Sequence, residues 1–369
     1  MPTDSELLNL LFPAARAVLR PEHGGLLARN LRAVSDWPAL AAFAESQHLA
    51  PLLMQHTRTA GLALPDEARL ALGGLAMRHR LAAQARQSAL EEILAAAQKA
   101  GLEVLLLKGA GAALLAYPQP GLRPMRDLDL LARPGQGLRL QDLLAHLGYR
   151  AEPSPLMGPG HRHLPEMARE VDGFHVAVEV HSELFDRHWT ARPPLVSDLF
   201  ARSRELRLGS VLARVPAYED LLWHTYQHLI NEGLRLISVA DMISLSEQYV
   251  TEIDWQRLRR KRPALINALA LFHSLSPLAG SLVERAGLAQ RLPPAPLAAG
   301  DFTGWPRISL AQARALPRGQ ALRATLSPPE WWLRLYFGLD GRAALSPYRY
   351  LRFPLELARF AWVHWQARG

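Results

Sequence analysis

Two aspartates separated by one leucine, Asp127 and Asp129, are the residues of this sequence that most directly suggest chemistry. On a β-strand, residues i and i+2 point to the same side, so their carboxylates can share one cation or a pair of cations. Leu128 and Leu130 would point to the other side and anchor the strand in a core. Magnesium prefers oxygen ligands and couples carboxylates to substrate phosphates. The pattern therefore predicts a site for Mg²⁺ or Mn²⁺.

A third acid is predicted on a separate strand. From Phe174 to Leu184 apolar and polar residues alternate, which is typical of a half-buried strand. Glu179 and His181 fall on its polar side and so project together. Glu179 would complete the metal site or take the proton of an acceptor. His181 would orient that carboxylate or contact a nucleotide, or it is a histidine satisfied at the strand end.

The sequence also offers groups for binding phosphate. Lys108-Gly109-Ala110-Gly111 lies between an apolar strand and a helix, where backbone amides and a helix N-terminus suit a triphosphate. Lys108, Arg123 and Arg126 would supply positive charge. Phosphoryl or nucleotidyl transfer needs charge neutralised on the phosphate and an acceptor oxygen held in line, as two metal ions about 4 Å apart can do.

Other polar residues allow two interpretations each. His224 and His228 have a spacing able to hold zinc, but structural packing is favoured because no H-E-x-x-H motif is present. Asp241 is either a polar contact toward the site or a buried, paired acid. The loop residues at 161–163 (His161, Arg162 and His163) are expected to face solvent.

The elements that must position these groups predict an α+β fold. Helical periodicity covers residues 4–100 and ends at Gly101, and strands are expected at 102–107, from Arg126 and at 174–184. Helices are expected near 138–147, 219–231, 234–249 and 254–260. We divide the chain into four parts: an N-terminal helical region (1–100), a small mixed-sheet core (101–215), a helical domain (216–290), and a Pro-rich linker with an aromatic and Arg-rich helical tail (291–369).

Composition limits the class of protein. The chain has 369 residues, 49% of them hydrophobic, a net charge of +8 and no cysteine, which excludes disulfides and thiolate metal sites and favours polyanionic partners. The N-terminus lacks the pattern of a secretory signal, so we expect a cytoplasmic protein. The uncharged stretch 264–283 is interrupted by polar residues and Pro277, which favours a buried helical hairpin over a membrane span.

The aromatic and arginine-rich tail, residues 331–368, has three interpretations. Its aromatic residues pack against the helical domain, or they form an interfacial helix at an anionic membrane surface, or they form a docking surface for a protein or nucleic acid. Core packing is favoured.

Three segments together resemble the bacterial uncharacterised-nucleotidyltransferase family of the polymerase-β-like superfamily. They are Leu105-Leu106-Leu107-Lys108-Gly109, residues 123–131 (RPMRDLDLL) and Val178-Glu179-Val180-His181. The resemblance runs from about Leu102 to Leu258. It implies a minimal mixed sheet, with Asp127 and Asp129 in one metal site and Glu179 as the third acid. The chain departs from the Gly-Ser turn of many members, since Lys108-Gly109-Ala110 lacks the hydroxyl.

The resemblance implies transfer of a nucleoside monophosphate from a triphosphate such as ATP. The acceptor would be a hydroxyl of a small molecule, peptide, sugar or RNA, including a toxin-like action on transfer RNA. The alternative is a non-catalytic scaffold with a degenerate nucleotidyltransferase fold that binds a nucleotide or a peptide. The retained acids Asp127, Asp129 and Glu179 favour the enzyme.

Overall fold

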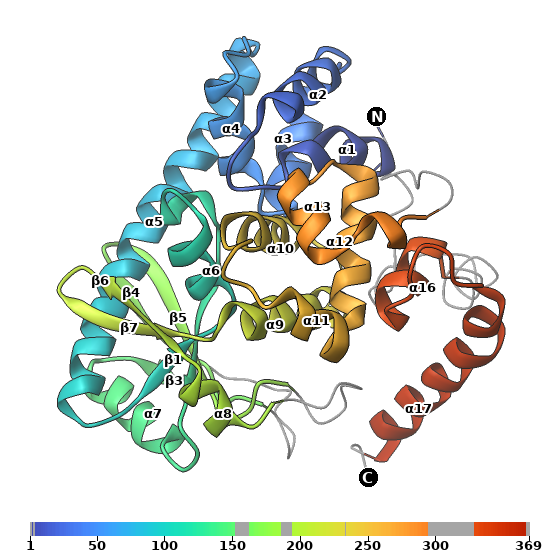
Figure 1. Ribbon diagram of the computed structural model, residues 1–369. Coiled ribbons are helices and arrows are strands. Elements are labelled where there is room, and N and C mark those ends of the chain that lie inside the picture. Colours follow the sequence, from blue (N-terminus) through green and yellow to red (C-terminus); the bar gives the residue numbers. More distant parts are fainter. Residues whose placement is uncertain are drawn as a thin grey trace.

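The computed structural model describes residues 2, 4–151, 162–185, 194–232, 234–293 and 328–366. The chain begins with a group of helices: α1 (Asp4–Leu11), α2 (Pro21–Arg32), α3 (Trp37–Ser46), α4 (Ala50–Thr59) and α5 (Asp66–Lys99). α5 has 34 residues and runs from these helices down to the sheet (Figure 1). Gly101, with φ of +65°, ends it in the left-handed conformation that glycine adopts without strain.

A mixed five-stranded sheet forms the core that the sequence predicts. Its strands are β1 (Val104–Leu106), β2 (Asp127–Ala132), β3 (Arg150–Ala151), β4 (Met167–Val171) and β5 (Phe174–His181), in the order β1-β2-β5-β4-β3. β2 and β5 are parallel, whereas the other neighbouring pairs are antiparallel. β3 and β4 were not predicted from the sequence, because β3 has only two residues and Met167-Ala168-Arg169-Glu170-Val171 does not alternate between apolar and polar residues.

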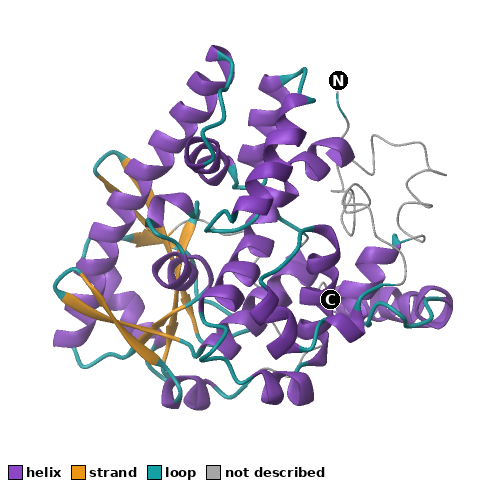
Figure 2. Ribbon diagram, turned by 45° about the horizontal axis from the view of Figure 1, so that its top comes forward, coloured by secondary structure: helices purple, strands orange, loops and turns teal. Residues whose placement is uncertain are grey.

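Short helices and a hairpin connect the sheet to the rest of the molecule. They are α6 (Lys108–Ala116), η2 (Pro120–Leu122), α7 (Gly137–His146), α8 (Val196–Ala201), and the hairpin β6 (Arg204–Leu208) with β7 (Val211–Val215). The hairpin, also missed from sequence, forms a separate antiparallel pair (Figure 2).

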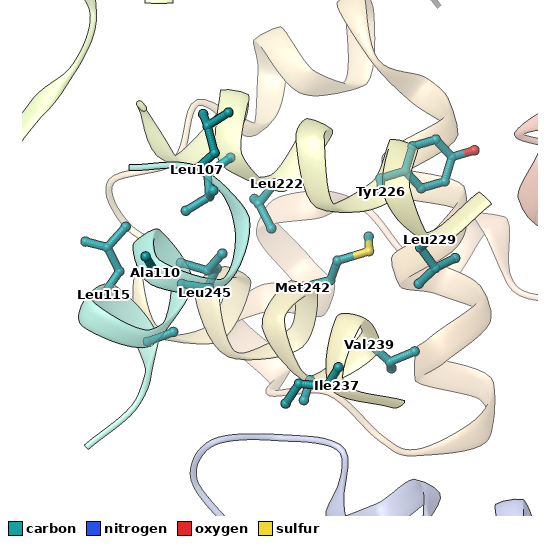
Figure 3. Close-up of a cluster of buried hydrophobic side chains, with 14 of the residues drawn as sticks. Leu107, Ala110, Leu115, Leu222, Tyr226, Leu229, Ile237, Val239, Met242 and Leu245 are labelled. Carbon is teal, nitrogen blue, oxygen red and sulfur yellow. The ribbon is translucent and has the colours of Figure 1, made fainter. Parts of the chain in front are cut away.

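A second group of helices packs on α6. It comprises α9 (Tyr218–Glu232), α10 (Leu236–Gln248), α11 (Trp255–Lys261), α12 (Pro263–Leu275), α13 (Gly280–Ala286) and η3 (Ala289–Arg291). Leu107, Ala110 and Leu115 meet apolar side chains of α9 and α10, including Leu222 and Leu245 (Figure 3). This packing fixes where the first residue of α6, Lys108, and the residue before α10, Arg235, lie.

The uncharged stretch 264–283 forms the rest of α12, a turn and the start of α13, as the sequence predicts. Residues Leu265–Phe272 are all buried. In the part of the chain that the structure describes, no helix is both long enough and apolar enough to cross a bilayer.

The two parts of the C-terminal tail lie in different environments, one buried and one exposed. In α16 (Glu330–Phe337) Trp331 and Trp332 are buried, and Trp332 stacks on Tyr336 at 4.4 Å between ring centroids. The π-helix η5 (Tyr348–Arg352) and α17 (Phe353–Gln366) follow, and Tyr350 and Trp362 are exposed. The first part of the tail is therefore core, whereas α17 extends away from the body (Figure 1).

The buried apolar side chains form one continuous cluster from Leu7 to Phe353. It joins the N-terminal helices, the sheet and the second group of helices. The division of the chain at residues 100, 215 and 290 therefore stays a prediction, and most of the predicted linker, 291–306, lies outside the described residues.

Candidate active site

The register of two parallel strands brings the predicted acids together. In the β2–β5 pair Asp129 lies directly beside Glu179, and Asp127 lies beside Ala177. Side chains at equivalent positions of neighbouring strands point to the same face of a sheet. The Asp129 side chain is 2% exposed and that of Glu179 is 15% exposed. One face of the sheet thus presents all three predicted carboxylates.

Two cationic groups contact Asp129. Lys108 Nζ donates a hydrogen bond to Asp129 Oδ1 at 2.9 Å, and His181 Nε2 lies 2.8 Å from the same oxygen. Lys108 begins α6 with φ of +36°, an unusual conformation for a residue with a side chain. Burial raises the pKa of Asp129, but Lys108 and the His181 hydrogen bond outweigh it and hold that pKa well below its ordinary range. Asp129 is therefore ionised.

His181 joins Asp129 to Glu179. Its Nε2 atom also lies 3.4 Å from Glu179 Oε2, so this nitrogen carries the proton. Burial lowers the pKa of His181, yet the bonds to both carboxylates outweigh burial and raise it. Burial likewise raises the pKa of Glu179, and the His181 bond outweighs that effect and lowers it. The histidine is fully buried rather than at the polar surface that the strand pattern indicated.

Asp127 behaves differently from Asp129. Burial, followed by the charge of Asp129, raises the pKa of Asp127 to about 7, and Glu179 and Glu166 add to the rise. Oxygens of Asp127, Glu166 and Glu179 lie within 4.8 Å of one another. Four carboxylates thus gather around Lys108 and His181, and negative charge is in excess.

Sequence reasoning missed Glu166. It directly precedes β4, and the antiparallel pairing of Met167 with Val178 brings it next to Glu179. Only a prediction of β4 could have placed Glu166 beside Glu179, and the sequence of β4 has a weak strand pattern. Glu166 is the one acid of this cluster that does not come from β2 or β5.

The donor set fits a hard divalent cation. Carboxylate oxygens are the ligands that Mg²⁺ and Mn²⁺ prefer, and a cation placed among them would lower the pKa that crowding raises at Asp127. Two groups have ligand atoms close enough to share an ion: Asp127, Glu166 and Glu179, and Asp129, Glu179 and His181. Asp129 receives both protein cations on Oδ1, which leaves Oδ2 outside these contacts.

Asp127 and Asp129 border a cleft with an interior volume of about 130 Å³. Asp127, Asp129, Lys108 and Gly109 line it, together with groups from more distant parts of the chain: His48, Arg123, Met125, Arg126, Thr225, His228, Arg235, Ile237, Ser238 and Asp241. Asp127 and Asp129 therefore face this cleft.

Arg123 lines the cleft but is already engaged. Its Nη2 lies 2.6 Å from Asp241 Oδ2, and Tyr117 donates a hydrogen bond to Asp241 Oδ1 at 2.7 Å. The Arg123 and Asp241 side chains are 11% and 2% exposed. A Cβ atom at Gly109 would lie 2.5 Å from Arg123 Nη1, which explains the glycine there. Asp241 agrees with both interpretations offered by sequence, because it is buried and paired with Arg123 and also lines the cleft.

The expectation of a solvent-facing loop at 161–163 is wrong for the two residues described. Arg162 is 8% exposed, and the His163 side chain is 15% exposed. Hydrogen bonds between backbone groups hold this segment beside the end of β5, since Leu164 N–H donates to Val180 O and Ser182 N–H to Arg162 O. His163 Nε2 lies 3.8 Å from Glu179 Oε2. His161 lies outside the described residues.

His224 and His228 contact each other, with their Nε2 atoms 3.0 Å apart. Both are buried in α9, and the ring of His224 packs against Phe185. Burial and the nearby His228 hold the pKa of His224 well below its ordinary range, so it is neutral. His228 reaches the cleft, whereas His224 lies behind it.

Solved structures with a related fold align only weakly. The crystal structure of ANT(2")-Ia in complex with adenylyl-2"-tobramycin aligns with a TM-score of 0.33 and 16% identity, covering 48% of this chain and 95% of that chain. An antigenic nucleotidyltransferase-like protein from Paracoccidioides brasiliensis aligns with a TM-score of 0.35 and 17% identity, covering 55% and 97%. Scores this low carry no further argument. No curated protein sequence matches the chain.

A family model gives the stronger result. The model described as uncharacterised nucleotidyltransferase matches residues 33–275, a span that includes the sheet, α3 to α5 and the helices to α12. The match is wider than the resemblance seen from sequence motifs, because it takes in the N-terminal helices that carry His48. The chain belongs to this uncharacterised nucleotidyltransferase family.

Proposed function

We propose that this protein transfers a nucleoside monophosphate from a nucleoside triphosphate, ATP among them, to a hydroxyl acceptor. Asp127, Asp129 and Glu179 would hold the divalent cations. One observation carries the proposal: the β2–β5 register brings the three acids together, Asp127 and Asp129 line the cleft, and burial and then crowding by Asp129 raise the pKa of Asp127 to about 7. Such crowding is typical of carboxylates that share a cation.

The proposed reaction is a single displacement. The acceptor hydroxyl gives its proton to solvent and its oxygen attacks the α-phosphorus, the bond from that phosphorus to the bridging oxygen breaks, and diphosphate leaves with the bond's electron pair. A bound Mg²⁺ or Mn²⁺ would neutralise charge on the phosphates and make the acceptor oxygen more nucleophilic. The lowered pKa of Glu179 favours a ligand role over that of a strong proton acceptor.

The remaining predicted residues would act in two ways. Lys108 and His181 hold Asp129 in its ionised form and fix its orientation through contacts of 2.9 and 2.8 Å. Gly109 leaves room for Arg123, which Asp241 holds at the cleft. Arg126 is exposed at the same cleft and would contact phosphate directly.

The test is release of diphosphate. The purified full-length chain is incubated with Mg²⁺, each of the four common ribonucleoside triphosphates and pools of sugar, peptide, aminoglycoside and RNA acceptors. We expect diphosphate release and a mass increase of one acceptor by a nucleoside monophosphate. Asp129→Asn should abolish both, whereas Asp142→Asn, an exposed acid of α7, should not.

The same assay separates the enzyme from a scaffold. Binding of a triphosphate that needs Mg²⁺ and is lost in Asp129→Asn agrees with the proposed chemistry. Binding of a nucleotide or peptide with equal affinity in wild type and Asp129→Asn, without turnover on any acceptor, would support the non-catalytic alternative.

A further inference from the structure

Besides Lys108, Arg123 and His228, three more basic residues line the cleft. His48 lies in the turn between α3 and α4, Arg126 just before β2, and Arg235 just before α10. We call these three residues the basic set. His48 adopts a φ of +57°, which is uncommon for a residue other than glycine, asparagine or aspartate. Residues nearly 190 positions apart in sequence are thus brought to one cleft.

The two arginines of the basic set carry positive charge that the described part of the protein does not neutralise. Among the residues that the structure describes, neither Arg126 nor Arg235 has a carboxylate within ion-pair distance, whereas Arg123 is bound to Asp241. The environment of His48 reflects this: burial first, and then the charges of Arg235, Arg126 and Arg123, lower its pKa to about 4 against an opposing effect of Glu45. Such a site attracts an anion.

The start of α10 strengthens the same potential. This helix has 13 residues, and Ile237 and Ser238 of its first turn line the cleft. Its N-cap residue, Arg235, makes no side-chain cap, and the Leu236 N–H is bonded to Gln47 Oε1 at 3.2 Å. A helix N-terminus carries partial positive charge and favours phosphate.

We propose that the basic set, with the first turn of α10, binds the diphosphate portion of the nucleotide, the group that leaves. This inference rests on the proposed function for the identity of the nucleotide. The site itself requires no metal, because its charge comes from guanidinium groups and a helix terminus. The carboxylates would hold the α-phosphate end through cations, and the basic set would hold the other end directly.

The first test measures binding of inorganic diphosphate to the full-length protein by calorimetry in the presence of EDTA. Arg126→Ala and Arg235→Ala should each weaken binding roughly 10- to 100-fold, the loss expected for one charge-assisted hydrogen bond. Arg260→Ala, an exposed arginine of α11, changes the net charge equally and should leave affinity unchanged. Equal affinity in all three variants, or no binding by wild type, would overturn the proposal.

A second test identifies the source of the phosphate. ATP and ADP should displace diphosphate in EDTA, whereas AMP should not, since it lacks the portion that the basic set binds. If ATP and diphosphate bind together without competition, the site belongs to a phosphorylated acceptor and the assignment to the nucleotide is wrong.

The failure of this inference differs from failure of the proposed function. Asp129→Asn should still bind diphosphate in EDTA while losing transfer. Transfer that is intact in Arg126→Ala and Arg235→Ala, at unchanged KM for the triphosphate, would leave the function standing and remove the diphosphate site.

Discussion

The acidic residues and the basic set of the cleft are built in opposite ways. Asp127, Asp129 and Glu179 lie on two strands that are hydrogen-bonded neighbours, and Asp129 is almost fully buried. Arg126 and Arg235 are exposed and lie in segments joined only by tertiary packing. The acids are therefore positioned by strand register, which is stiff, whereas the basic set depends on how the helices pack.

One buried ion pair connects the basic set. Arg123 lies three residues before Arg126, and Asp241 lies six residues after Arg235, so the Arg123–Asp241 pair links the two segments that carry the arginines. Tyr117 also donates a hydrogen bond to Asp241. The acidic side needs no such link, because β2 and β5 already share a ladder.

The largest expected effect separates activity from stability on the acidic side. Asp127→Asn should lower the rate of nucleotidyl transfer about 1000-fold, since a lost metal ligand costs several kcal/mol of transition-state stabilisation. The same change should stabilise the metal-free protein by roughly 2–4 kcal/mol at pH 8, because it removes an ionised carboxylate whose pKa is raised to about 7.

The measurement pairs a transfer assay with thermal unfolding in EDTA, and Asp142→Asn serves as the control. A variant that loses activity without gaining stability would show that Asp127 is not under repulsion in the free protein. The difference in how the acidic residues and the basic set are built would then be smaller than the geometry indicates.

The next effect falls on the link between the arginines. Asp241→Ala should destabilise the protein by about 3–5 kcal/mol, because it leaves the Arg123 guanidinium buried and without its partner. Chemical denaturation measures this loss. The paired change Arg123→Met with Asp241→Leu should recover most of the stability. It should still weaken diphosphate binding, because Arg126 and Arg235 lose their common anchor; unchanged binding would show that they are positioned independently.

The difference between local strand register and long-range helix packing explains which residues of the site the sequence could predict. An Asp-x-Asp pattern and an alternating strand carry their geometry locally, so the sequence alone points to Asp127, Asp129 and Glu179. The flanking helices follow from periodicity, and the mixed sheet follows from the resemblance to a known family. Lys108 stays a predicted phosphate ligand: its Nζ donates a hydrogen bond to Asp129, and the residue also lines the cleft.

The rest depends on contacts that no local pattern encodes. Glu166 reaches the acids through β4, whose residues do not alternate. His48 and Arg235 reach the cleft through the packing of α3, α4 and α10. Arg162 is buried and His163 is half-buried because backbone hydrogen bonds bring their loop to the end of β5, which glycine- and proline-rich surroundings do not reveal.

A change in pH should alter the stability contributions of Asp127 and His48 in opposite directions. The raised pKa of Asp127 means that the folded protein holds more protons than the unfolded chain between about pH 4 and 7. This residue therefore costs stability as pH rises through that window. The pKa of His48, lowered to about 4, means that the unfolded chain holds more protons between about pH 4 and 6.5. His48 therefore costs stability as pH falls.

Two variants isolate these slopes. In EDTA, the stability gained by Asp127→Asn should grow by roughly 2–4 kcal/mol as pH rises from about 4 to 8. The stability gained by His48→Asn should grow by about 1 kcal/mol as pH falls, after allowance for solvent screening. Asparagine tolerates the positive φ of residue 48. Denaturation curves at half-unit pH intervals give both slopes. Diphosphate should abolish the pH dependence of the stability gained by His48→Asn and leave that of Asp127→Asn unchanged. If both stability gains changed with pH in the same direction, the assignment of opposite charges would be contradicted.

The smallest expected effect probes the boundary between the two sides. At Gly109 an added Cβ would lie 2.5 Å from Arg123 Nη1 and 3.2 Å from Met125 Cβ. Gly109→Ala should cost about 1 kcal/mol of stability, as modest overpacking does. Gly74→Ala, an exposed glycine of α5 with nothing near the new Cβ, should instead stabilise the helix by up to about 1 kcal/mol.

The effect of Gly109→Ala on ligand binding tests the separation of the two sides of the cleft more sharply than its effect on the stability of the protein does. Arg123 must shift while Asp241 holds its Nε and Nη2, so the strain passes to the segment that carries Arg126. Diphosphate affinity should fall a few-fold, whereas Mn²⁺ affinity, measured by paramagnetic relaxation, should not change. Loss of Mn²⁺ binding would mean that Gly109 supports the acids through Lys108, and that the two sides of the cleft are mechanically coupled rather than separately positioned.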